Sequence, residues 1–296
     1  MFTFLKRFLS NNKKEHSGIN RTRITDVLGE KRMIGGRNKK LTYQSVSCLS
    51  VGKERRHNED TIFTLDSQMH GLDESVYFGL FMVADGMGGH QSGEIASSLA
   101  ARGVSKFIID HLLLAYLFDR QTLTYSKMEK LVEEAFAEAQ AQILQRVPGG
   151  GTTLTLAFVV DDDLFTAHVG DSRLYILSKD GTLSLKTKDH TLVKRLIELG
   201  EITQSQANAH PQRNVLYRAL GQSDELSPDF DHLKLKKGDI IVLCTDGLWG
   251  VIDEDEIIRI IQNGPDIENS ACNLVEAANQ AGGPDNISVV LVERME

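Results

Sequence analysis

The sequence is poor in cysteine, with only Cys48, Cys244 and Cys272 among its 296 residues. The three residues are odd in number and widely spaced, and no Cys-x-x-Cys pair occurs. This pattern argues against a disulfide framework and favours a reducing compartment, in which thiols serve as small core residues. We therefore expect a cytoplasmic location.

Long hydrophobic runs are also absent. No apolar stretch approaches the roughly 18 residues that a membrane-spanning helix requires. The start of the chain, residues 1–9, combines apolar residues with a basic pair but is too short for a secretory signal and its cleavage site. A disordered basic tail and a helix lying weakly on an anionic membrane both fit it, and we favour the tail.

Positive charge is scarce outside the first part of the chain. Residues 1–40 carry 11 Lys and Arg against 3 Asp and Glu, whereas residues 41–296 carry 22 against 38. We predict a flexible basic arm at 1–40 and a single acidic domain at 41–296. The acidic balance argues against nucleic acid as a partner and suits carboxylates gathered around cations.

Hydrophobic periodicity predicts an α+β domain built on antiparallel sheets. The expected strands are 41–51, 61–65, 75–84, 152–160, 164–169, 173–178, 239–245 and 287–292. The expected helices are 93–109, 126–147, 192–199, 255–262 and 267–280, and residues 201–215 are expected to be irregular. Three consecutive aspartates at 161–163 fit a hairpin turn better than a cation-binding loop.

Carboxylates recur at the ends of the apolar runs. Glu59 and Asp60 precede one run, Asp85 and Asp246 each follow one, and Asp285 precedes the last. Two divalent cations about 3.5–4 Å apart need several carboxylates to offset their repulsion, and such a set at the ends of strands would supply them. Because no His or Cys cluster accompanies these residues, the ligand set favours Mg²⁺ or Mn²⁺ over zinc.

The central member of this set is Asp85, which is followed by Gly86, Gly88 and Gly89. Glycine leaves the backbone carbonyl unshielded, so Asp85 and the Gly86 carbonyl could both serve a hard cation. Taken alone, the stretch also fits an ordinary strand-to-helix turn. The companion carboxylates favour the metal site.

Arg55 could supply a complementary cation. It lies shortly before Glu59 and could hold a phosphoryl group bidentately. Its neighbour Arg56 would face the opposite way on an extended segment, and we interpret it as a solvated surface charge. Ser172 lacks the surroundings of a nucleophile elbow, and the Gly150–Thr153 turn lacks the lysine of a P-loop. We interpret both turns as scaffold, and we expect Asp171 and Arg173 to make buried structural bonds.

Read in order, these motifs resemble a known family. They are Gly52-x-x-Arg55-x-x-Asn58-Glu59-Asp60, Asp85-Gly-Met-Gly-Gly89, Gly150-Gly-Thr-Thr153, Gly170-Asp-Ser-Arg173, Asp189-His190-Thr191, His210-Pro-x-Arg-Asn214, Arg218-Ala-Leu-Gly221, Thr245-Asp-Gly247 and Gly283-Pro-Asp-Asn286. The set resembles the metal-dependent protein phosphatases, the PPM or protein phosphatase 2C class, and above all its compact bacterial branch. The resemblance spans residues 41–294.

The resemblance implies two antiparallel sheets packed as a sandwich and flanked by helices, with two Mn²⁺ or Mg²⁺ ions at one end. It implies that Asp85 bridges both metals with help from the Gly86 carbonyl. Asp246 and Asp285 would complete one metal, Asp60 the other, and Glu59 would act through water. It further implies that Arg55 binds the substrate phosphate, and that a hydroxide between the metals attacks phosphorus in line. Residues 189–221 would form a flap beside the site, here called the flap segment.

The implied function is a protein serine/threonine phosphatase that opposes a Ser/Thr kinase, acts on phosphoproteins and is a monomer. The chain departs from some members in having Met87 where a general acid could stand; His90 is nearby but is better interpreted as a helix-start residue. It also lacks a carboxylate at 145–148, so we expect a third metal to be weak or absent. Two alternatives remain: a catalytically weak binding module with the same fold, and a phosphatase of small phosphate esters.

Overall fold

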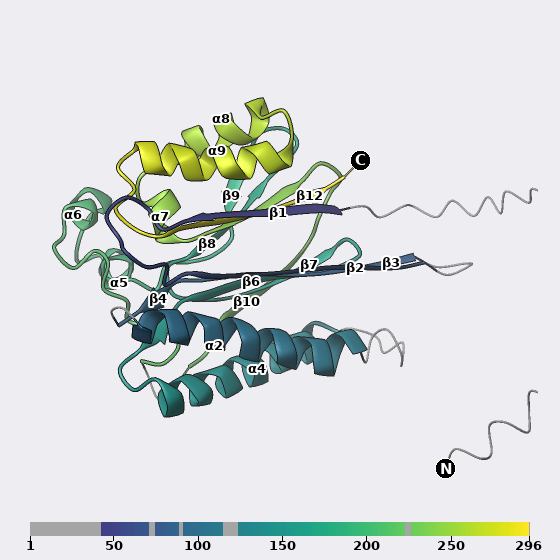
Figure 1. Cartoon of the computed structure of the whole chain (residues 1–296), viewed down its shortest axis with the longest axis horizontal. Helices are drawn as coiled ribbons and strands as arrows, with labels where there is room; N and C mark the ends of the chain where they lie inside the picture. The colour runs from purple at the N-terminus through teal and green to yellow at the C-terminus, as the bar shows by residue number, and fades with distance from the viewer. Residues whose placement is uncertain (1–42, 71–74, 89–90, 115–123, 223–225, 296) are drawn as a thin grey trace, which may run out of the picture. The chain divides into compact units, whose positions relative to one another are not determined.

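The computed structural model describes residues 43–70, 75–88, 91–114, 124–222 and 226–295, and its elements are labelled as in Figure 1. The predicted arm at 1–40 and His90 lie outside the described residues. No helix of the described part is long and apolar enough to cross a membrane.

Two five-stranded antiparallel sheets form the centre of the fold. The first has the order β1-β12-β11-β8-β9, with β1 Tyr43–Ser50, β12 Ile287–Arg294, β11 Ile240–Cys244, β8 Arg173–Leu177 and β9 Leu183–Leu185. The second has the order β10-β7-β6-β3-β2, with β10 Asp229–Lys234, β7 Asp163–Val169, β6 Leu154–Val160, β3 Ser75–Ala84 and β2 Thr61–His70. A short pair joins β4 Gly86–Met87 to β5 Gly151–Thr152.

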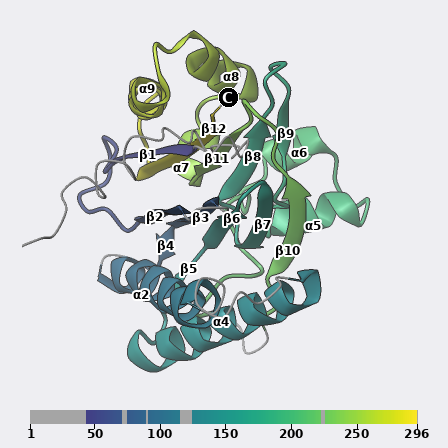
Figure 2. The same ribbon diagram turned by 90° about the vertical axis from the view of Figure 1, so that its right-hand side faces the viewer.

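Helices cover the outer face of each sheet (Figures 1 and 2). The second sheet is covered by α2 Gln91–Ile108, which continues as the π-helical turn η2 Ile109–Leu113, and by α4 Tyr125–Arg146. The first sheet is covered by α7 Asp246–Trp249, α8 Glu254–Asn263 and α9 Ile267–Gln280. Two further helices, α5 Leu192–Glu198 and α6 Gln204–Asn208, belong to the flap segment.

The layers explain why the central strands are apolar throughout. Along β6, Leu156 and Phe158 pack toward α2 and α4, whereas Ala157 and Val159 pack toward the other sheet. A strand between two layers has no solvent face, so its sequence is a continuous apolar run rather than an alternation. The α+β sandwich with flanking helices is therefore confirmed.

Most expected elements are present, and the errors occur in polar segments. The segment 201–215 was expected to be irregular, and this is wrong at α6, where Thr203 and Gln206 form a reciprocal capping box. The strand expected at 61–65 continues to His70, because the whole of β2 pairs with β3 as an edge strand with an exposed polar face. Strands β9 and β10 were not expected.

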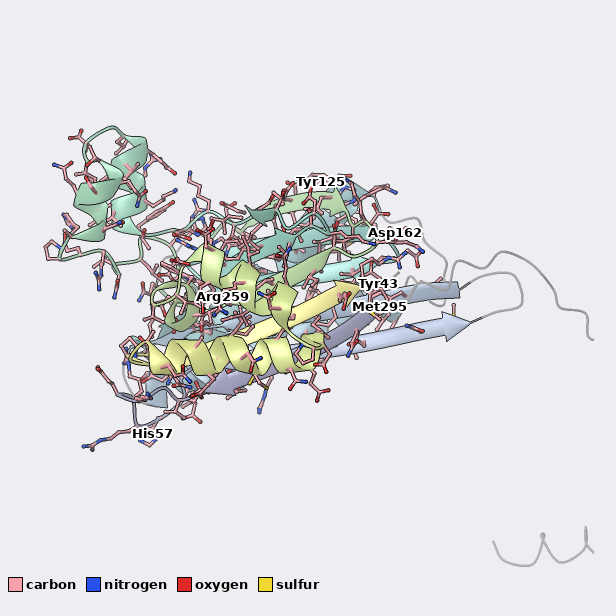
Figure 3. All side chains as sticks on the ribbon, turned by 90° about the horizontal axis from the view of Figure 1, so that it is seen from above. Tyr43, His57, Tyr125, Asp162, Arg259 and Met295 are labelled. Atoms are coloured by element: carbon pink, nitrogen blue, oxygen red, sulfur yellow. The ribbon has the colours of Figure 1, made fainter. Side chains whose placement is uncertain are left out.

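The strand register brings the predicted site residues to one end of the sandwich. Thr61, which follows Asp60, is paired with Ala84, which precedes Asp85. In the other sheet Ser50 is paired with Ile287 and Cys244 with Val289, so the ends of β1 and β11 meet the start of β12. Figure 3 shows His57 at this end and Tyr43, Asp162 and Met295 at the opposite end.

Candidate metal centre

A cavity of about 460 Å³ lies at this end of the sandwich. The lining residues include the predicted site residues Arg55, Glu59, Asp85, Gly86, Asp246 and Asp285, together with Met87, Thr153, Asp171 and Asn286. Asp60 is not in the lining, but its side chain accepts a hydrogen bond of 2.9 Å from Thr245, next to Asp246. The structure thus brings all the predicted residues together from four separate segments.

The backbone of Asp85 is held by the turn that opens β6. The Asp85 N–H donates to Thr153 Oγ1 over 2.9 Å. The Asp85 carbonyl accepts from the Thr153 N–H and from Thr152 Oγ1, each at 2.9 Å. The Gly150–Thr153 motif is therefore scaffold for Asp85, and not a phosphate-binding loop.

Asn286 joins the loops that carry Arg55, Glu59 and Asp285. Its buried side chain accepts from the Glu59 N–H at 2.8 Å and donates to the carbonyls of Val51 at 2.8 Å and His57 at 2.9 Å. Truncation would leave a buried N–H and two carbonyls without partners. The sequence showed Asn286 only as a neighbour of Asp285, because its partners lie more than 200 residues away in the chain.

Burial and like charge raise the pKa of the clustered carboxyl groups. Desolvation, with the charges of Asp246 and Asp285 adding to it, raises the pKa of Asp60 to about 7. Desolvation and then the charge of Asp285 raise the pKa of Asp246 to about 6. The pKa of Asp85 is raised well above its usual range by desolvation and then by Asp60 and Asp246. Ionising all the carboxyl groups of such a cluster is costly unless cations offset their mutual repulsion.

The donor set fits hard divalent cations. Asp60 Oδ1 and Asp246 Oδ1 are buried and have no hydrogen-bond partner among the described residues, so each is an oxygen available to a metal. Within those residues no three carboxylate, imidazole or thiolate groups already converge as a closed metal cage. Asp285 instead forms a 2.7 Å ion pair with Arg55.

Asp171 is a site residue that the sequence interpretation assigned to scaffold. Its side chain is buried and lines the cavity, and desolvation followed by the charge of Asp246 raises its pKa well above the usual range. Arg173 in the same motif is structural as predicted, since it pairs with Asp189. In the sequence Asp171 stands beside a glycine, two residues after the apolar run that ends at Val169, but this pattern does not distinguish it from a structural aspartate.

A family model of protein phosphatase 2C matches residues 54–290 of this chain. The chain belongs to the protein phosphatase 2C family. The serine/threonine phosphatase Stp of Listeria innocua is 34% identical over 243 residues, which cover 82% of this chain and 92% of that protein. The crystal structure of the Mycobacterium tuberculosis serine/threonine phosphatase PstP/Ppp has a TM-score of 0.71 at 32% identity and covers 86% of this chain and 100% of its own. The catalytic domain of PstP in complex with two manganese ions has a TM-score of 0.67, also at 32% identity, with 86% and 100% covered.

The remaining candidates in this protein phosphatase 2C domain take structural positions. The three aspartates at 161–163 form a turn, in which Asp161 accepts from the Tyr77 N–H at 3.0 Å, Asp162 pairs with Arg294 and Asp163 with His232. Arg56 is exposed, as expected for a surface charge. Ser172 is buried and its hydroxyl is 2.8 Å from that of Thr153, so it makes a structural bond, as expected of a residue that is no nucleophile.

Glycine is required where the loops of the site cross. Gly52 has φ of +80°, and a Cβ there would lie 2.2 Å from the Asp285 carbonyl oxygen. Gly149 has nearly the same conformation, with φ of +83°, but a Cβ there would meet nothing within 4 Å. The two positions therefore separate backbone strain from a clash.

We expect Gly52→Ala to lower the free energy of unfolding by about 3 kcal/mol or more and to weaken Mn²⁺ binding, because the Asp285 loop must move. Gly149→Ala carries only the strain of a left-handed alanine, about 1–2 kcal/mol, and should leave Mn²⁺ affinity unchanged. Urea unfolding and calorimetric titration with Mn²⁺ measure both quantities. Equal losses of stability and of Mn²⁺ affinity in the two variants would show that the close approach of Gly52 to the Asp285 carbonyl contributes to neither.

The raised pKa of Asp60 predicts a pH-dependent stability in the metal-free protein. A carboxyl with a folded-state pKa of about 7, against 3.8 when unfolded, binds a proton more tightly in the native state. It therefore stabilises the fold below its unfolded pKa, and this contribution is lost as pH rises through 7.

We expect Asp60→Asn in EDTA to raise Tm at pH 8 by about 3 °C or more, and this advantage to shrink as the pH falls to 6. Comparing variant with wild type cancels the titrations that Asp60 does not influence, including that of buried His168, whose pKa desolvation lowers to about 4. Scanning calorimetry across that pH range measures the difference. A difference in Tm that stays constant with pH would contradict the raised pKa.

Proposed function

We infer that the chain is a metal-dependent protein serine/threonine phosphatase of the bacterial type. The observation that carries this is the cluster of Asp60, Asp85, Asp246 and Asp285 at one end of the sandwich, with two buried carboxylate oxygens available to cations. Relatives that cover nearly the same span support it, since they are described as serine/threonine phosphatases. A related catalytic domain holds two manganese ions, which supports a site for two Mn²⁺ or Mg²⁺ ions here.

We assign the residues as follows. Asp85 would hold both cations, assisted by the Gly86 carbonyl, while Asp246 and Asp285 would hold one of them. Asp60 would hold the other, and Glu59 would act through water. When bound, the ions would supply positive charge to the phosphoryl oxygens and lower the pKa of a bound water.

Arg55 would bind the substrate phosphate. Its guanidinium now pairs with Asp285 at 2.7 Å, and its side chain is half exposed at the edge of the cavity. A cation on Asp285 would compete for that carboxylate and leave the guanidinium fork available for two phosphate oxygens. Met87, which also lines the cavity, cannot donate a proton, so the leaving alkoxide would take its proton from water.

The finer assignments are proposals of the same kind. Residues 41–296 would form a single catalytic domain with the flap segment beside its site, acting as a monomer on phosphoproteins and opposing a Ser/Thr kinase. The expectation of a weak or absent third metal stays a prediction. Asp171 bears on this prediction, because it places a further carboxylate near Asp246 that could contribute to a third metal site.

Hydrolysis of a phosphothreonine peptide by the purified protein tests this function. We expect phosphate release with Mn²⁺ or Mg²⁺ that is abolished by EDTA and by Asp246→Ala. Circular dichroism of the variant controls for folding. No release from the folded, metal-loaded protein would favour a binding module with the same fold, and release from p-nitrophenyl phosphate but from no phosphopeptide would favour small phosphate esters.

A further inference from the structure

A second cavity, of about 710 Å³, lies between the flap segment and the body of the domain. Four residues, Arg55, Asn214, Asp246 and Asp285, line both this cavity and that of the metal centre. The two cavities therefore adjoin at Arg55, the residue proposed to bind the substrate phosphate. A peptide whose phosphate is held at the metal centre would pass its neighbouring residues into the second cavity.

Most of the charges that line the second cavity already have partners. Arg173 forms a bidentate ion pair with Asp189, with Nε–Oδ1 and Nη2–Oδ2 distances of 3.0 and 2.7 Å. Its Cζ also lies 3.7 Å from the centroid of the Trp249 ring. Arg55 pairs with Asp285, and Asp246 belongs to the metal centre. The other two charged residues of the lining are Lys194 and Arg213, and both are cations of the flap segment.

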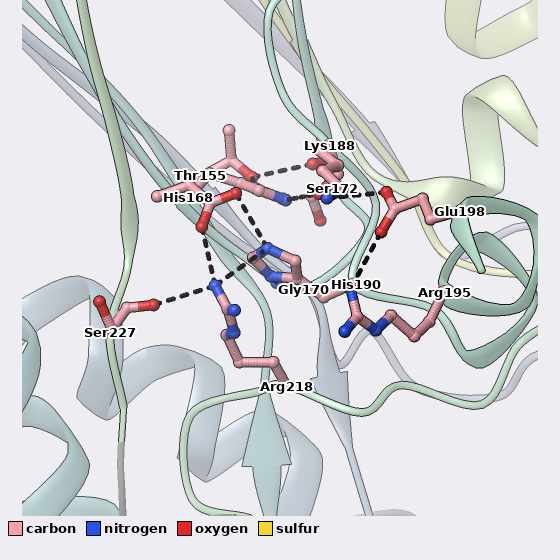
Figure 4. Close-up of polar contacts among 11 residues, drawn as sticks. Thr155, His168, Gly170, Ser172, Lys188, His190, Arg195, Glu198, Arg218 and Ser227 are labelled. Atoms are coloured by element: carbon pink, nitrogen blue, oxygen red, sulfur yellow. Dashed lines mark hydrogen bonds and ion pairs between the residues drawn. The ribbon is translucent and has the colours of Figure 1, made fainter.

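Lys194 has no carboxylate partner among the residues that the structure describes. Its natural partner on the helix is Glu198, four residues later, but Glu198 pairs with Lys188 at 2.7 Å and with Arg195 at 3.4 Å (Figure 4). Lys194 also lies in the first turn of α5, where the helix dipole disfavours a positive charge. Neither a local ion pair nor helix stability therefore accounts for a lysine here.

Arg213 is in a similar situation. It is exposed, and its guanidinium donates a hydrogen bond of 3.3 Å to the carbonyl of Asn208. No carboxylate within the described ranges pairs with it. A guanidinium with most of its five donors unused, on the wall of a cavity, is suited to a carboxylate or a phosphate.

We propose that Lys194 and Arg213 form an anion-binding subsite that selects substrates with an acidic or phosphorylated side chain close to the phosphoresidue that is hydrolysed. The inference rests on the proposed phosphatase function and names its substrate class. It is supported by the location of these two cations in a region, residues 41–296, with 22 basic against 38 acidic residues. The acidic body of the domain repels anionic substrates at long range. Two cations without a described carboxylate partner, located beside the active site, reverse the sign of the charge locally.

The test compares kcat/KM for three phosphothreonine peptides with Mn²⁺-loaded protein. One peptide carries glutamates on both sides of the phosphothreonine, the second has glutamine at those positions, and the third has one glutamate replaced by a non-hydrolysable phosphonate. The enzymes are wild type, Lys194→Ala/Arg213→Ala, and Arg195→Ala as a matched control. Arg195 is a cation on the same helix, already paired with Glu198, and does not line the cavity.

We expect wild type to favour the glutamate peptide over the glutamine peptide by about tenfold at low salt, as two charge-assisted contacts allow. The ratio should fall toward one in the double variant and, for wild type, in about 0.5 M NaCl. Arg195→Ala should keep the ratio, and p-nitrophenyl phosphate, which has no neighbouring residues, should be hydrolysed at the same rate by all three proteins.

The phosphonate peptide identifies the anion that the subsite prefers. A larger preference for the phosphonate than for glutamate would identify a second phosphate as the favoured anion, and equal preference would identify acidic residues as sufficient.

Two results would overturn the proposal while leaving the phosphatase function intact. One is hydrolysis of the glutamate and glutamine peptides with the same kcat/KM by wild type, and the other is a ratio that the double variant preserves. Failure of folded, metal-loaded wild type to hydrolyse any phosphopeptide would instead refute the proposed function, and the subsite with it.

Discussion

Replacing Asp85 with asparagine is expected to abolish phosphate release while the protein stays folded. Desolvation and then the charges of Asp60, Asp246, Asp171 and Asp285 raise the pKa of this carboxyl group, which we propose holds both cations. Asparagine keeps the shape but removes the charge. A loss of several kcal/mol of transition-state stabilisation corresponds to a fall of about 10³-fold or more in kcat.

The same substitution should not destabilise the metal-free protein. The backbone of Asp85, not its side chain, makes the bonds to Thr152 and Thr153, and these remain. Removal of one of several repelling carboxylates should leave Tm in EDTA unchanged or higher. Asp180→Asn, at an exposed turn where the side chain accepts from the Thr182 N–H, is a control that should alter neither quantity. Activity retained by Asp85→Asn at saturating Mn²⁺ would refute the assigned role.

The convergence of these carboxylates at one end of the sandwich could be predicted from the sequence, because they follow a local rule. Each predicted ligand stands at the end of an apolar run, and in antiparallel sheets such ends meet at common edges. Asp60 and Asp85 come together through the pairing of β2 with β3, and Asp246 and Asp285 through that of β11 with β12. The central strands could also be predicted, because a strand between two packed layers has a continuous apolar sequence.

What was missed depends on contacts far apart in the chain. Strand β10 is a polar edge strand that pairs only with β7, so its Asp229–Lys234 sequence shows little strand pattern. Packing against β7 holds this strand in place, since the rings of Phe230 and His232 both stack on Phe165. Asp171 could not be separated from a structural aspartate, because only the folded chain shows that its side chain faces the cavity while Arg173, two residues later, turns to Asp189.

The pair formed by Arg173 and Asp189 gives the largest expected effect on stability. The guanidinium binds both oxygens of Asp189 and donates to the Tyr175 hydroxyl at 2.9 Å, and the two charged side chains are only 19% and 12% exposed. Arg173→Met would leave the charge of Asp189 largely buried and uncompensated. Breaking a buried ion pair from one side lowers the free energy of unfolding by about 3–5 kcal/mol.

The origin of this loss can be separated by a second substitution. If the unpaired charge of Asp189 causes it, Arg173→Met/Asp189→Asn should regain most of the lost stability in urea unfolding. Arg259→Met, which breaks the exposed pair with Glu256, should leave the free energy of unfolding nearly unchanged, because solvent screens that pair. A double variant as unstable as the single one would instead assign the loss to the contact of Arg173 with Trp249. Because Trp249 donates to the Asp171 carbonyl at 3.0 Å, that outcome should be accompanied by weaker Mn²⁺ binding as the Asp171 loop moves.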